Sequence, residues 1–286
     1  MERDIIRAYA KINLGLDVIG RLPGGYHEVK MVMQTVGIYD ELTLEKTEGG
    51  VSLTTDCGEL PTGGDNLICK AAELMRSRYG ITEGVRIRLH KNIPIAAGMA
   101  GGSTDAAATM RAMNRLFGLD VSREELMQAS VSIGADVPYC ILGGTALAEG
   151  IGERLTTLEK VPPMALLVAK PDINVSTKSV YGQLDAVGQL RHPDIDGMVE
   201  AIGQGSLSGI VERLGNVLET VTVPAYPVIS VIKKRMCELG AMGSLMSGSG
   251  PTVFGVFPDK ESAGSACARL RQEGLAGQLF VTEPVE

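Results

Sequence analysis

The hydrophobic and polar positions in the first half of the chain alternate between strand-like and helix-like patterns. Residues 5–18 and 36–46 carry short β-branched and alternating runs, which are typical of strands. Residues 65–79 begin with a capping Asp-Asn pair and continue in a helical pattern, and residues 85–90 alternate again as a strand. These patterns predict a mixture of helices and strands.

Apolar spacing and capping residues predict two further helices. Apolar side chains recur at helical spacing over residues 106–117, and Ser103 or Thr104 is a suitable N-cap just before them. Residues 122–125 read Ser-Arg-Glu-Glu, a capping box that predicts a short helix stopped by Gly134. The first of these helices would begin directly after a glycine-rich segment.

The composition changes near residue 160, where Glu-Lys-Val-Pro-Pro separates two patterned regions. The segments that follow read as strand, helix, glycine turn with strand, and helix, over residues 165–169, 228–239, 244–257 and 261–272. We therefore predict an α+β protein with two domains, 1–160 and 161–286, the second a compact α+β sandwich. The stretch 182–209 stands out as loosely polar and glycine-rich.

Composition and charge limit the classes of partner. The 286 residues are 44% hydrophobic and carry a formal net charge of −7, which argues against nucleic acid or an anionic membrane surface. No stretch approaches the length of an apolar membrane span, and no secretion signal is visible, so a cytoplasmic location is expected. Three histidines and no clustered ligands argue against a built-in zinc site. Five scattered cysteines fit reduced thiols: Cys57, Cys69, Cys140, Cys237 and Cys267.

The segment from residue 94 to residue 108 has the composition of an anion-binding loop. Small side chains leave room for a ligand, while Gly98, Gly101 and Gly102 permit the positive φ angles that turn successive N–H groups the same way. The loop runs into a predicted helix, whose N-terminus offers unpaired N–H groups and the positive end of the helix dipole. Phosphate is the expected ligand, and an ordinary glycine-rich turn before a packed helix is the alternative.

The spacing of this loop excludes two familiar phosphate-binding motifs. No Lys follows the glycines as it does in the Walker A loop, and Gly-x-x-Gly-Gly-Ser does not match Gly-x-Gly-x-x-Gly. The loop is therefore nearly free of positive charge. A metal ion, or basic residues from elsewhere in the chain, would have to balance the charge of a bound nucleotide.

Lys11 and Asn13 lie two residues apart in a predicted strand and therefore share one face. Such a pair on an apolar strand faces either water or a ligand, and from this segment alone a solvated edge strand is the simpler interpretation. Asp136 stands among small and apolar residues, where it is a good N-cap for a following helix. If Lys11 lies near Asp136, the ammonium would hold this carboxylate ionised for a functional role.

Two loops have both a structural and a functional interpretation. Residues 245–254 contain a second glycine-serine turn, which is either a plain tight turn or the other side of a polyphosphate site. Tyr26 and His27 follow a Pro-Gly-Gly loop, and this pair of rings suits a nucleobase as well as it suits a surface anchor. Each signal is weak when it is taken alone.

Together these segments resemble the GHMP kinase superfamily, in the order of that family and over nearly the whole chain. The matching motifs are Ala10-Lys11-Ile12-Asn13-Leu14, Gly25-Tyr26-His27, Asp65-Asn66-Leu67, residues 94–108, Gly134-Ala135-Asp136-Val137-Pro138 and Gly248-Ser249-Gly250-Pro251-Thr252. The resemblance implies an N-terminal domain like the second domain of ribosomal protein S5, a ferredoxin-like C-terminal domain, and ATP in the cleft between them. Within the superfamily, the chain is most similar to the branch that phosphorylates the 2-hydroxyl of 4-diphosphocytidyl-2-C-methyl-D-erythritol in non-mevalonate isoprenoid synthesis.

The resemblance also implies roles for individual residues. ATP would be bound by the glycine loop and by two residues near its adenosine end, namely Pro94, Ile95, Ala96, Ala97, Gly98, Met99, Ala100, Gly101, Gly102, Ser103 and Thr104, with Asn66 and Lys91. Asp136 would accept the proton of the substrate hydroxyl, with Lys11 beside it. The cytidine diphosphate-linked methylerythritol would contact Asn13 and Thr177 through its polyol, Tyr26 and Tyr181 through the faces of the cytosine, and His27 through the edge of that base.

The same resemblance leaves several points open. Mg²⁺ bound to ATP would neutralise charge, with the hydroxyl of Ser103 as a ligand, and Asp105 is interpreted as structural. Ala96 and Ala100 stand where many relatives have glycine, and we expect alanine to fit there if these positions use negative φ angles. The alternatives are another superfamily kinase acting on homoserine, mevalonate or a sugar, and a non-catalytic nucleotide-binding or dimerisation module. Monomer and homodimer are both compatible with the sequence.

Overall fold

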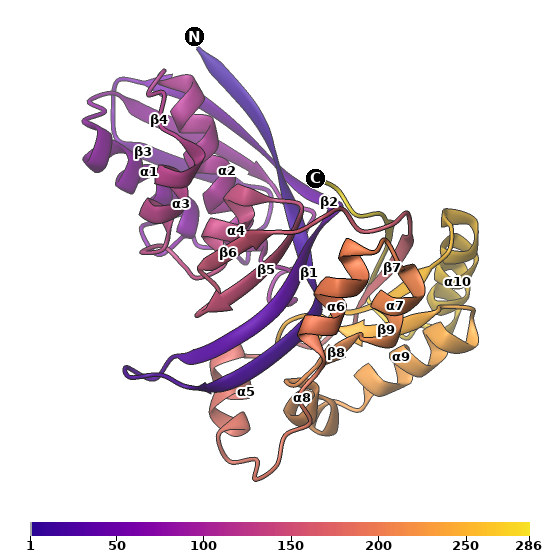
Figure 1. Ribbon diagram of the computed structural model, residues 1–286. Coiled ribbons are helices and arrows are strands. Elements are labelled where there is room, and N and C mark those ends of the chain that lie inside the picture. Colours follow the sequence, from indigo (N-terminus) through magenta and orange to yellow (C-terminus); the bar gives the residue numbers. More distant parts are fainter. Residues whose placement is uncertain (1) are drawn as a thin grey trace. The chain divides into compact units, whose positions relative to one another are not determined.

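The computed structural model describes residues 2–286, which form two compact units (Figure 1). The first unit comprises the chain up to residue 10 with residues 38–93 and 100–142, and the second comprises residues 11–37, 94–99 and 143–286. Strands β1 (Arg3–Arg21) and β2 (His27–Thr47) are long enough to contribute residues to both. The units are therefore interleaved along the chain, and the domain boundary near residue 160 stays a prediction.

The first unit combines strands with four helices. Strand β4 (Gly84–His90) pairs antiparallel with the second half of β2 and parallel with β3 (Val51–Thr55). The helices are α1 (Leu67–Tyr79), α2 (Gly101–Leu116), α3 (Arg123–Ser130) and α4 (Val137–Leu142). Alternate strand residues such as Leu44 and Ile87 are fully buried in one core with Met75 of α1 and Met110 of α2. The apolar stripe predicted before residue 117 is thus a packing face.

The caps of α1 and α3 are those that the sequence predicts. The Asn66 side chain accepts a hydrogen bond from the N–H of Ile68 at 2.9 Å, and Ser122 accepts one from the N–H of Glu125 at 3.1 Å. The predicted end of α3 at Gly134 is wrong, because the helix ends at Ser130. Turns replace its last residues, where the carbonyl of Ser130 accepts from the N–H groups of Ile133 and Gly134.

The second unit contains the remaining strands and helices. Its strands are β5 (Thr145–Gly150), β6 (Arg154–Thr157), β7 (Ala165–Lys170), β8 (Gly215–Asn216), β9 (Gly243–Met246), β10 (Val253–Phe257) and β11 (Gln278–Thr282). Its helices are α5 (Thr177–Leu184), α6 (Ile195–Gly203), α7 (Leu207–Glu212), α8 (Glu219–Ala225), α9 (Val228–Glu238) and α10 (Lys260–Glu273). The first half of β2 pairs antiparallel with β5, and β1 pairs parallel with β8.

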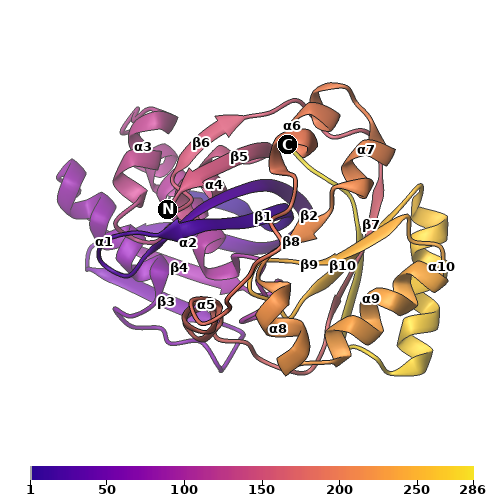
Figure 2. The ribbon, with the colours of Figure 1, turned by 60° about the horizontal axis from the view of Figure 1, so that its bottom comes forward.

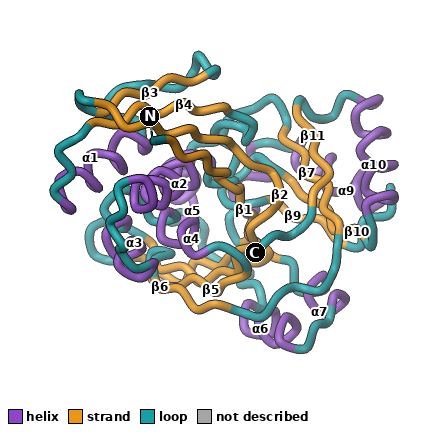
Figure 3. The backbone as a smooth tube through the Cα atoms, turned by 90° about the horizontal axis from the view of Figure 1, so that it is seen from above, coloured by secondary structure: helices purple, strands orange, loops and turns teal. Residues whose placement is uncertain are grey.

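A four-stranded antiparallel sheet occupies the C-terminal part of the second unit. Its strand order is β11-β7-β10-β9, and Figure 3 shows β7 beside β11. Helices α9 and α10 contact this sheet (Figure 2), and every residue of β10 is buried. The strands and helices predicted after residue 160 are therefore present, and they form the expected α+β arrangement.

The glycine-rich stretch 182–209 contains two helices that the hydrophobic pattern does not indicate. Helix α6 begins after Asp194, whose carboxylate accepts from the N–H of Gly197 at 2.9 Å. Helix α7 begins after Ser206, whose hydroxyl accepts from the N–H of Gly209 at 3.1 Å. Each helix is short and has a glycine in its first turn, which hides the usual pattern although the capping residues are visible.

Candidate active site

Helix α2 begins earlier than predicted, inside the glycine loop. Its first residue is Gly101 and its N-cap is Ala100, which makes no side-chain capping hydrogen bond. The prediction that Ser103 or Thr104 is the N-cap is wrong, because the carbonyl of Ala100 already accepts from the N–H of Thr104 at 2.9 Å. The Thr104 hydroxyl instead donates to the carbonyl of Tyr9 at 2.6 Å. The first unpaired N–H groups of the helix thus fall on small residues, as an anion site requires.

Two alanines of the loop adopt the conformation that usually needs glycine. The φ angles of Ala96 and Ala100 are +50° and +58°, so neither position meets the condition of a negative φ under which alanine is expected to fit. A left-handed conformation costs an L-residue about 1–2 kcal/mol. At Ala100 this conformation brings the carbonyl to the first turn of α2, so the loop stores strain where the helix starts.

The second glycine turn contacts the first part of the phosphate loop. The hydroxyl of Ser247 donates to the carbonyl of Gly98 at 3.0 Å. Gly98 has a φ of +72°, and a Cβ there would overlap the carbonyl oxygen of Ser247, so both the angle and the contact require glycine. The N–H of Gly250 closes a tight turn onto the carbonyl of Ser247 at 3.0 Å. The turn is therefore tight and contacts the loop, and its role as the other side of a polyphosphate site stays a prediction.

A buried asparagine that sequence reasoning missed anchors this second turn. The Nδ2 group of Asn216 donates to the carbonyls of Met246 and Gly248, both at 2.8 Å, while its Oδ1 accepts from the N–H of Leu218 at 2.9 Å. Glu219 accepts from the N–H of Met246 at 2.9 Å. Neither residue belongs to a recognisable motif, and their contacts arise only when β8 and the first residue of α8 come to the end of β9.

Lys11 and Asn13 form a buried pair on β1. Their exposed fractions are 5% and 0%, and the Lys11 ammonium donates to Asn13 Oδ1 at 2.8 Å. The N–H of Lys11 also donates to the carbonyl of Met99 at 3.2 Å, which joins the strand to the phosphate loop. The interpretation as a solvated edge strand is therefore wrong. A buried ammonium requires polar partners, and this one is held beside the loop.

Asp136 lies directly before α4 and is partly exposed. Its carbonyl accepts from the N–H of Cys140 at 3.0 Å, which closes the first turn of that helix. Asp136 belongs to the first unit, whereas Lys11 and Asn13 belong to the second. Its role as the base therefore stays a prediction.

The aromatic residues predicted to bind a base lie at one end of the second unit. The rings of His27 and Tyr181 have centroids 5.0 Å apart at an interplanar angle of 42°, and Tyr26 is 61% exposed. The sequence did not indicate Asp185, which follows α5 and lies with Oδ1 2.6 Å from Nε2 of His27. This hydrogen bond lowers the pKa of Asp185. His27 is therefore held in place between a carboxylate and an aromatic ring.

Thr177 opens helix α5 and connects it to the second glycine turn. Its hydroxyl lies 2.8 Å from the hydroxyl of Ser249. The N-cap of the helix is Ser176, which accepts from the N–H of Ser179 at 3.4 Å. Thr177, which is predicted to bind the polyol of the substrate, thus contacts the turn that touches the phosphate loop.

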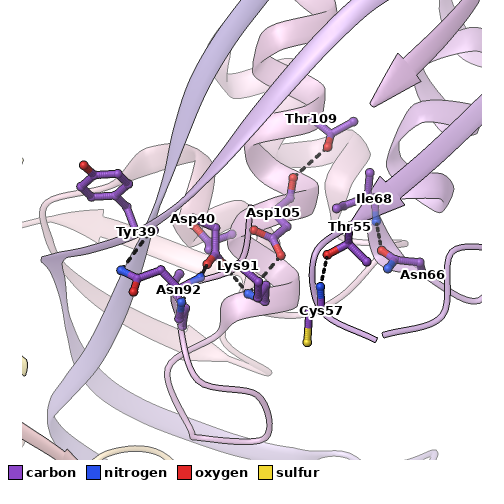
Figure 4. Close-up of polar contacts among 12 residues, drawn as sticks. Tyr39, Asp40, Thr55, Cys57, Asn66, Ile68, Lys91, Asn92, Asp105 and Thr109 are labelled. Carbon is purple, nitrogen blue, oxygen red and sulfur yellow. Dashed lines mark hydrogen bonds and ion pairs between the residues drawn. The ribbon is translucent and has the colours of Figure 1, made fainter. Parts of the chain in front are cut away.

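The two residues predicted at the adenosine end of ATP are both engaged with the protein. The Asn66 amide caps α1 and donates to the carbonyl of Pro61 at 2.7 Å. The Lys91 ammonium contacts Asp40 and lies 3.3 Å from Oδ2 of Asp105 (Figure 4). Burial raises the pKa of Asp105 well above its usual range. These contacts agree with the interpretation of Asp105 as structural.

The described chain shows neither a preformed metal cluster nor a membrane helix. Within residues 2–286, no three His, Cys, Asp or Glu side chains are grouped to hold a metal ion. Over the same residues, no helix has the length and apolar character needed to cross a membrane.

Two family models match the chain. The model described as GHMP kinases N terminal domain matches residues 66–144, and the one described as GHMP kinases C terminal matches residues 186–276. A 4-diphosphocytidyl-2-C-methyl-D-erythritol kinase from Lachnospira eligens is 54% identical over 284 residues, which cover 99% of each chain. The chain belongs to the GHMP kinase family. It is a phosphotransferase, and ATP is its co-substrate.

Further comparisons agree with this family. A relative of the same name from Caldicellulosiruptor saccharolyticus is 50% identical over 93% of this GHMP kinase and 92% of the relative. A crystal structure of 4-(cytidine 5'-diphospho)-2C-methyl-D-erythritol kinase has a TM-score of 0.84 at 33% identity, covering 99% of this chain and 100% of that one. Homoserine kinase from Cytophaga hutchinsonii has a TM-score of 0.80 at 22% identity, with 99% and 95% covered, and shows the fold alone. The predicted GHMP kinase fold is confirmed.

Proposed function

We propose that this GHMP kinase transfers the γ-phosphate of ATP to the 2-hydroxyl of 4-diphosphocytidyl-2-C-methyl-D-erythritol. Two relatives that bear the name of this kinase support the proposal, because they align with nearly the full chain at 54% and 50% identity. The reaction places the protein in the non-mevalonate route to isoprenoid precursors.

The observation that carries the proposal is the group of His27, Tyr181 and Asp185 beside the exposed Tyr26. A ring held edge-on by a carboxylate, with a second ring 5.0 Å away, offers both stacking and hydrogen bonding to a nucleobase. In the proposed complex Tyr26 and Tyr181 stack on the cytosine and His27 binds its edge. Homoserine and mevalonate carry no base, and such a group would have no ligand there.

Residues 94–104 bind the phosphates of ATP in this proposal, and Asn66 and Lys91 form the adenosine end of the site. When bound with ATP, Mg²⁺ neutralises charge on the transferred phosphate. Mg²⁺ prefers oxygen ligands and keeps several of them as water and phosphate, so the hydroxyl of Ser103 beside the phosphates fits it without a carboxylate cluster. The unpaired N–H groups at the start of α2 supply the remaining attraction to the phosphates.

The residues that act on the acceptor are Asp136, Lys11, Asn13 and Thr177. Phosphoryl transfer depends mainly on alignment and charge neutralisation, so these residues need only orient the hydroxyl and remove its proton. Asp136 accepts the proton and Lys11 assists it, while Asn13 and Thr177 bind the polyol. The buried Lys11–Asn13 hydrogen bond of 2.8 Å supports this assignment, because it orients the ammonium before substrate binds.

The proposal extends to location and organisation. Five cysteines that form no disulfide bond and a metabolic small-molecule substrate support a cytoplasmic protein, active as a monomer or a homodimer. We assign its N-terminal GHMP kinase domain to residues 1–160 and its C-terminal domain to residues 161–286.

A substrate panel tests the function directly. Purified enzyme with Mg²⁺ and ATP is given the cytidyl substrate, homoserine and mevalonate in parallel, and ADP release is measured with each. We expect turnover with the cytidyl substrate to exceed turnover with the others by at least 10³-fold at equal concentration, because only this substrate fills the base site. Preference for homoserine or mevalonate would overturn the proposal.

A further inference from the structure

We propose that Asp40, Lys91 and Asp105 form a buried joint that positions the phosphate loop, and that Lys91 serves ATP through this joint rather than by touching the nucleotide. All three residues belong to the first unit, and Figure 4 shows them turned toward one another. The inference rests on the proposed ATP site and changes the part that Lys91 plays in it. None of the motifs in the sequence indicates Asp40.

The geometry links the two ends of the loop. Lys91 directly follows β4, three residues before Pro94, whereas Asp105 lies in the second turn of α2. The Lys91 ammonium contacts Asp40 and lies 3.3 Å from Asp105, and the three side chains are exposed by only 7%, 0% and 3%. A Cβ at Gly101 would lie 3.0 Å from this ammonium, so the glycine lets the helix start approach it.

Asp40 also fixes the backbone that leads into the loop. Its Oδ1 accepts from the N–H of Asn92 at 2.6 Å and from the N–H of Ile93 at 2.7 Å. Its Oδ2 contacts Lys91. One carboxylate of β2 therefore holds two backbone groups next to Pro94 and the cation that reaches the helix. Charge-assisted hydrogen bonds of this kind are stronger than neutral ones.

The charges of the joint balance when one of the two carboxyl groups is protonated. A single ammonium cannot neutralise two buried carboxylates, and burial raises the pKa of Asp105. Oδ1 of Asp105 has no hydrogen-bond partner in the described chain, so this group gains little from being ionised. The joint is thus an Asp40–Lys91 ion pair with a neutral Asp105. In this state the Lys91 ammonium interacts with Asp40 and Asp105 rather than with the nucleotide.

Four variants test this arrangement. Asp105→Asn copies the neutral acid, so we expect KM for ATP and the dissociation constant of ADP to change less than threefold. In Asp40→Asn, Asp105 can ionise and pair with the Lys91 ammonium in place of Asp40. We therefore expect nucleotide affinity to fall only about three- to tenfold. D40N/D105N leaves the ammonium unpaired, and nucleotide affinity should fall more than 30-fold. In the neutral variant D40N/K91M/D105N, affinity should return to within threefold of Asp105→Asn.

The neutral variant separates the two roles of Lys91. If Lys91 contacts the nucleotide itself, its loss cannot restore binding, and an affinity that stays at least tenfold weak at wild-type melting temperature would overturn the proposal. A loss above tenfold in Asp105→Asn would also overturn it, because the carboxylate would then be ionised and required. If D40N/D105N does not fold, the comparison of the other variants still distinguishes the two roles of Lys91.

Two controls exclude a general effect on stability. Asp56→Asn removes an exposed carboxylate that accepts from the N–H of Lys91 at 3.0 Å, and it should leave nucleotide affinity unchanged. KM for the cytidyl substrate should change less than twofold in Asp40→Asn, and equal changes in both KM values would contradict a role at the loop. ADP binding is measured without acceptor, so the joint can be tested even if the proposed acceptor is wrong.

Discussion

At the scale of single residues, a buried polar side chain can be recognised in the sequence only when its partner lies close to it along the chain. Lys11 and Asn13 are polar groups inside an apolar strand, and their mutual hydrogen bond offsets the cost of desolvation. Asp40 and Asn216 are equally buried, but each binds backbone groups far away in the sequence. A local pattern reveals the first pair and cannot reveal the second, because those contacts exist only after folding.

Asp136 is the residue on which the proposed chemistry depends most. We expect Asp136→Asn to lower kcat by about 10²–10⁴ while both KM values change less than threefold, because only proton removal is lost. Steady-state kinetics with ATP and the cytidyl substrate measure this. Asp120→Asn is the control, since Asp120 is an exposed turn residue with φ +53°, which Asn also tolerates. Normal turnover in Asp136→Asn would show that another group accepts the proton.

Tyr26 gives the test of base recognition. Its ring is 61% exposed, so removing it costs the fold little. Stacking of a base on an aromatic ring contributes about 1–3 kcal/mol, and we therefore expect Tyr26→Ala to raise KM for the cytidyl substrate by about tenfold or more. KM for ATP should not change, and Tyr26→Phe should behave as wild type because the ring remains. A rise in both KM values would place Tyr26 outside the base site.

At the scale of elements, caps and periodicity predict where helices are, and backbone geometry decides where they begin and end. Helix α1 has the predicted cap at Asn66 and the predicted end near Tyr79. Helix α2 begins at Gly101 because Ala100 takes a left-handed conformation, which no side-chain pattern shows. Helices α6 and α7 escaped prediction because a glycine in each first turn interrupts an already short pattern. The sequence predicts an anion site in the loop, but it does not reveal the left-handed conformation of Ala96 and Ala100.

The strain at Ala96 and Ala100 has a measurable consequence. Glycine accepts a positive φ freely but makes the unfolded chain more flexible, so Ala96→Gly or Ala100→Gly should each raise the free energy of unfolding by about 0.5–1 kcal/mol. Ala97 is the matched control, since it is buried without a positive φ, and Ala97→Gly should lower that free energy by about 0.5–1 kcal/mol. Urea denaturation measures all three. Equal losses at the three positions would show that the left-handed conformation carries no strain.

At the scale of the whole molecule, an acidic protein is proposed to bind two polyanions. The chain has 27 Lys and Arg residues against 34 Asp and Glu residues, so attraction to ATP must come from local groups rather than from net charge. The N–H groups at the start of α2 are such a source, and they act only if nearby negative charge is suppressed. A neutral Asp105, in the second turn of α2, meets this requirement. The attraction of the start of α2 for ATP therefore depends on the proton that Asp105 keeps.

That proton makes the stability of the protein depend on pH in a predictable direction. In the unfolded chain Asp105 has an ordinary pKa of about 3.9, whereas burial raises its pKa in the folded protein beside Asp40 and Lys91. Between these two values the folded protein keeps a proton that the unfolded chain releases. The contribution of Asp105 is therefore fully present below about pH 4 and is lost as pH rises toward its folded pKa.

The Asp105→Asn variant isolates this effect, because its amide does not titrate. We expect the free energy of unfolding of the variant, minus that of the wild type, to be larger at pH 8 than at pH 5, because the wild type loses the contribution of Asp105 as pH rises through the raised folded pKa. Denaturation series at matched ionic strength measure this difference, and titrating groups that do not interact with Asp105 cancel in it. A difference that stays constant over the range would mean that Asp105 titrates alike in the folded and unfolded chain, and the assignment of a neutral Asp105 beneath the phosphate loop would be wrong.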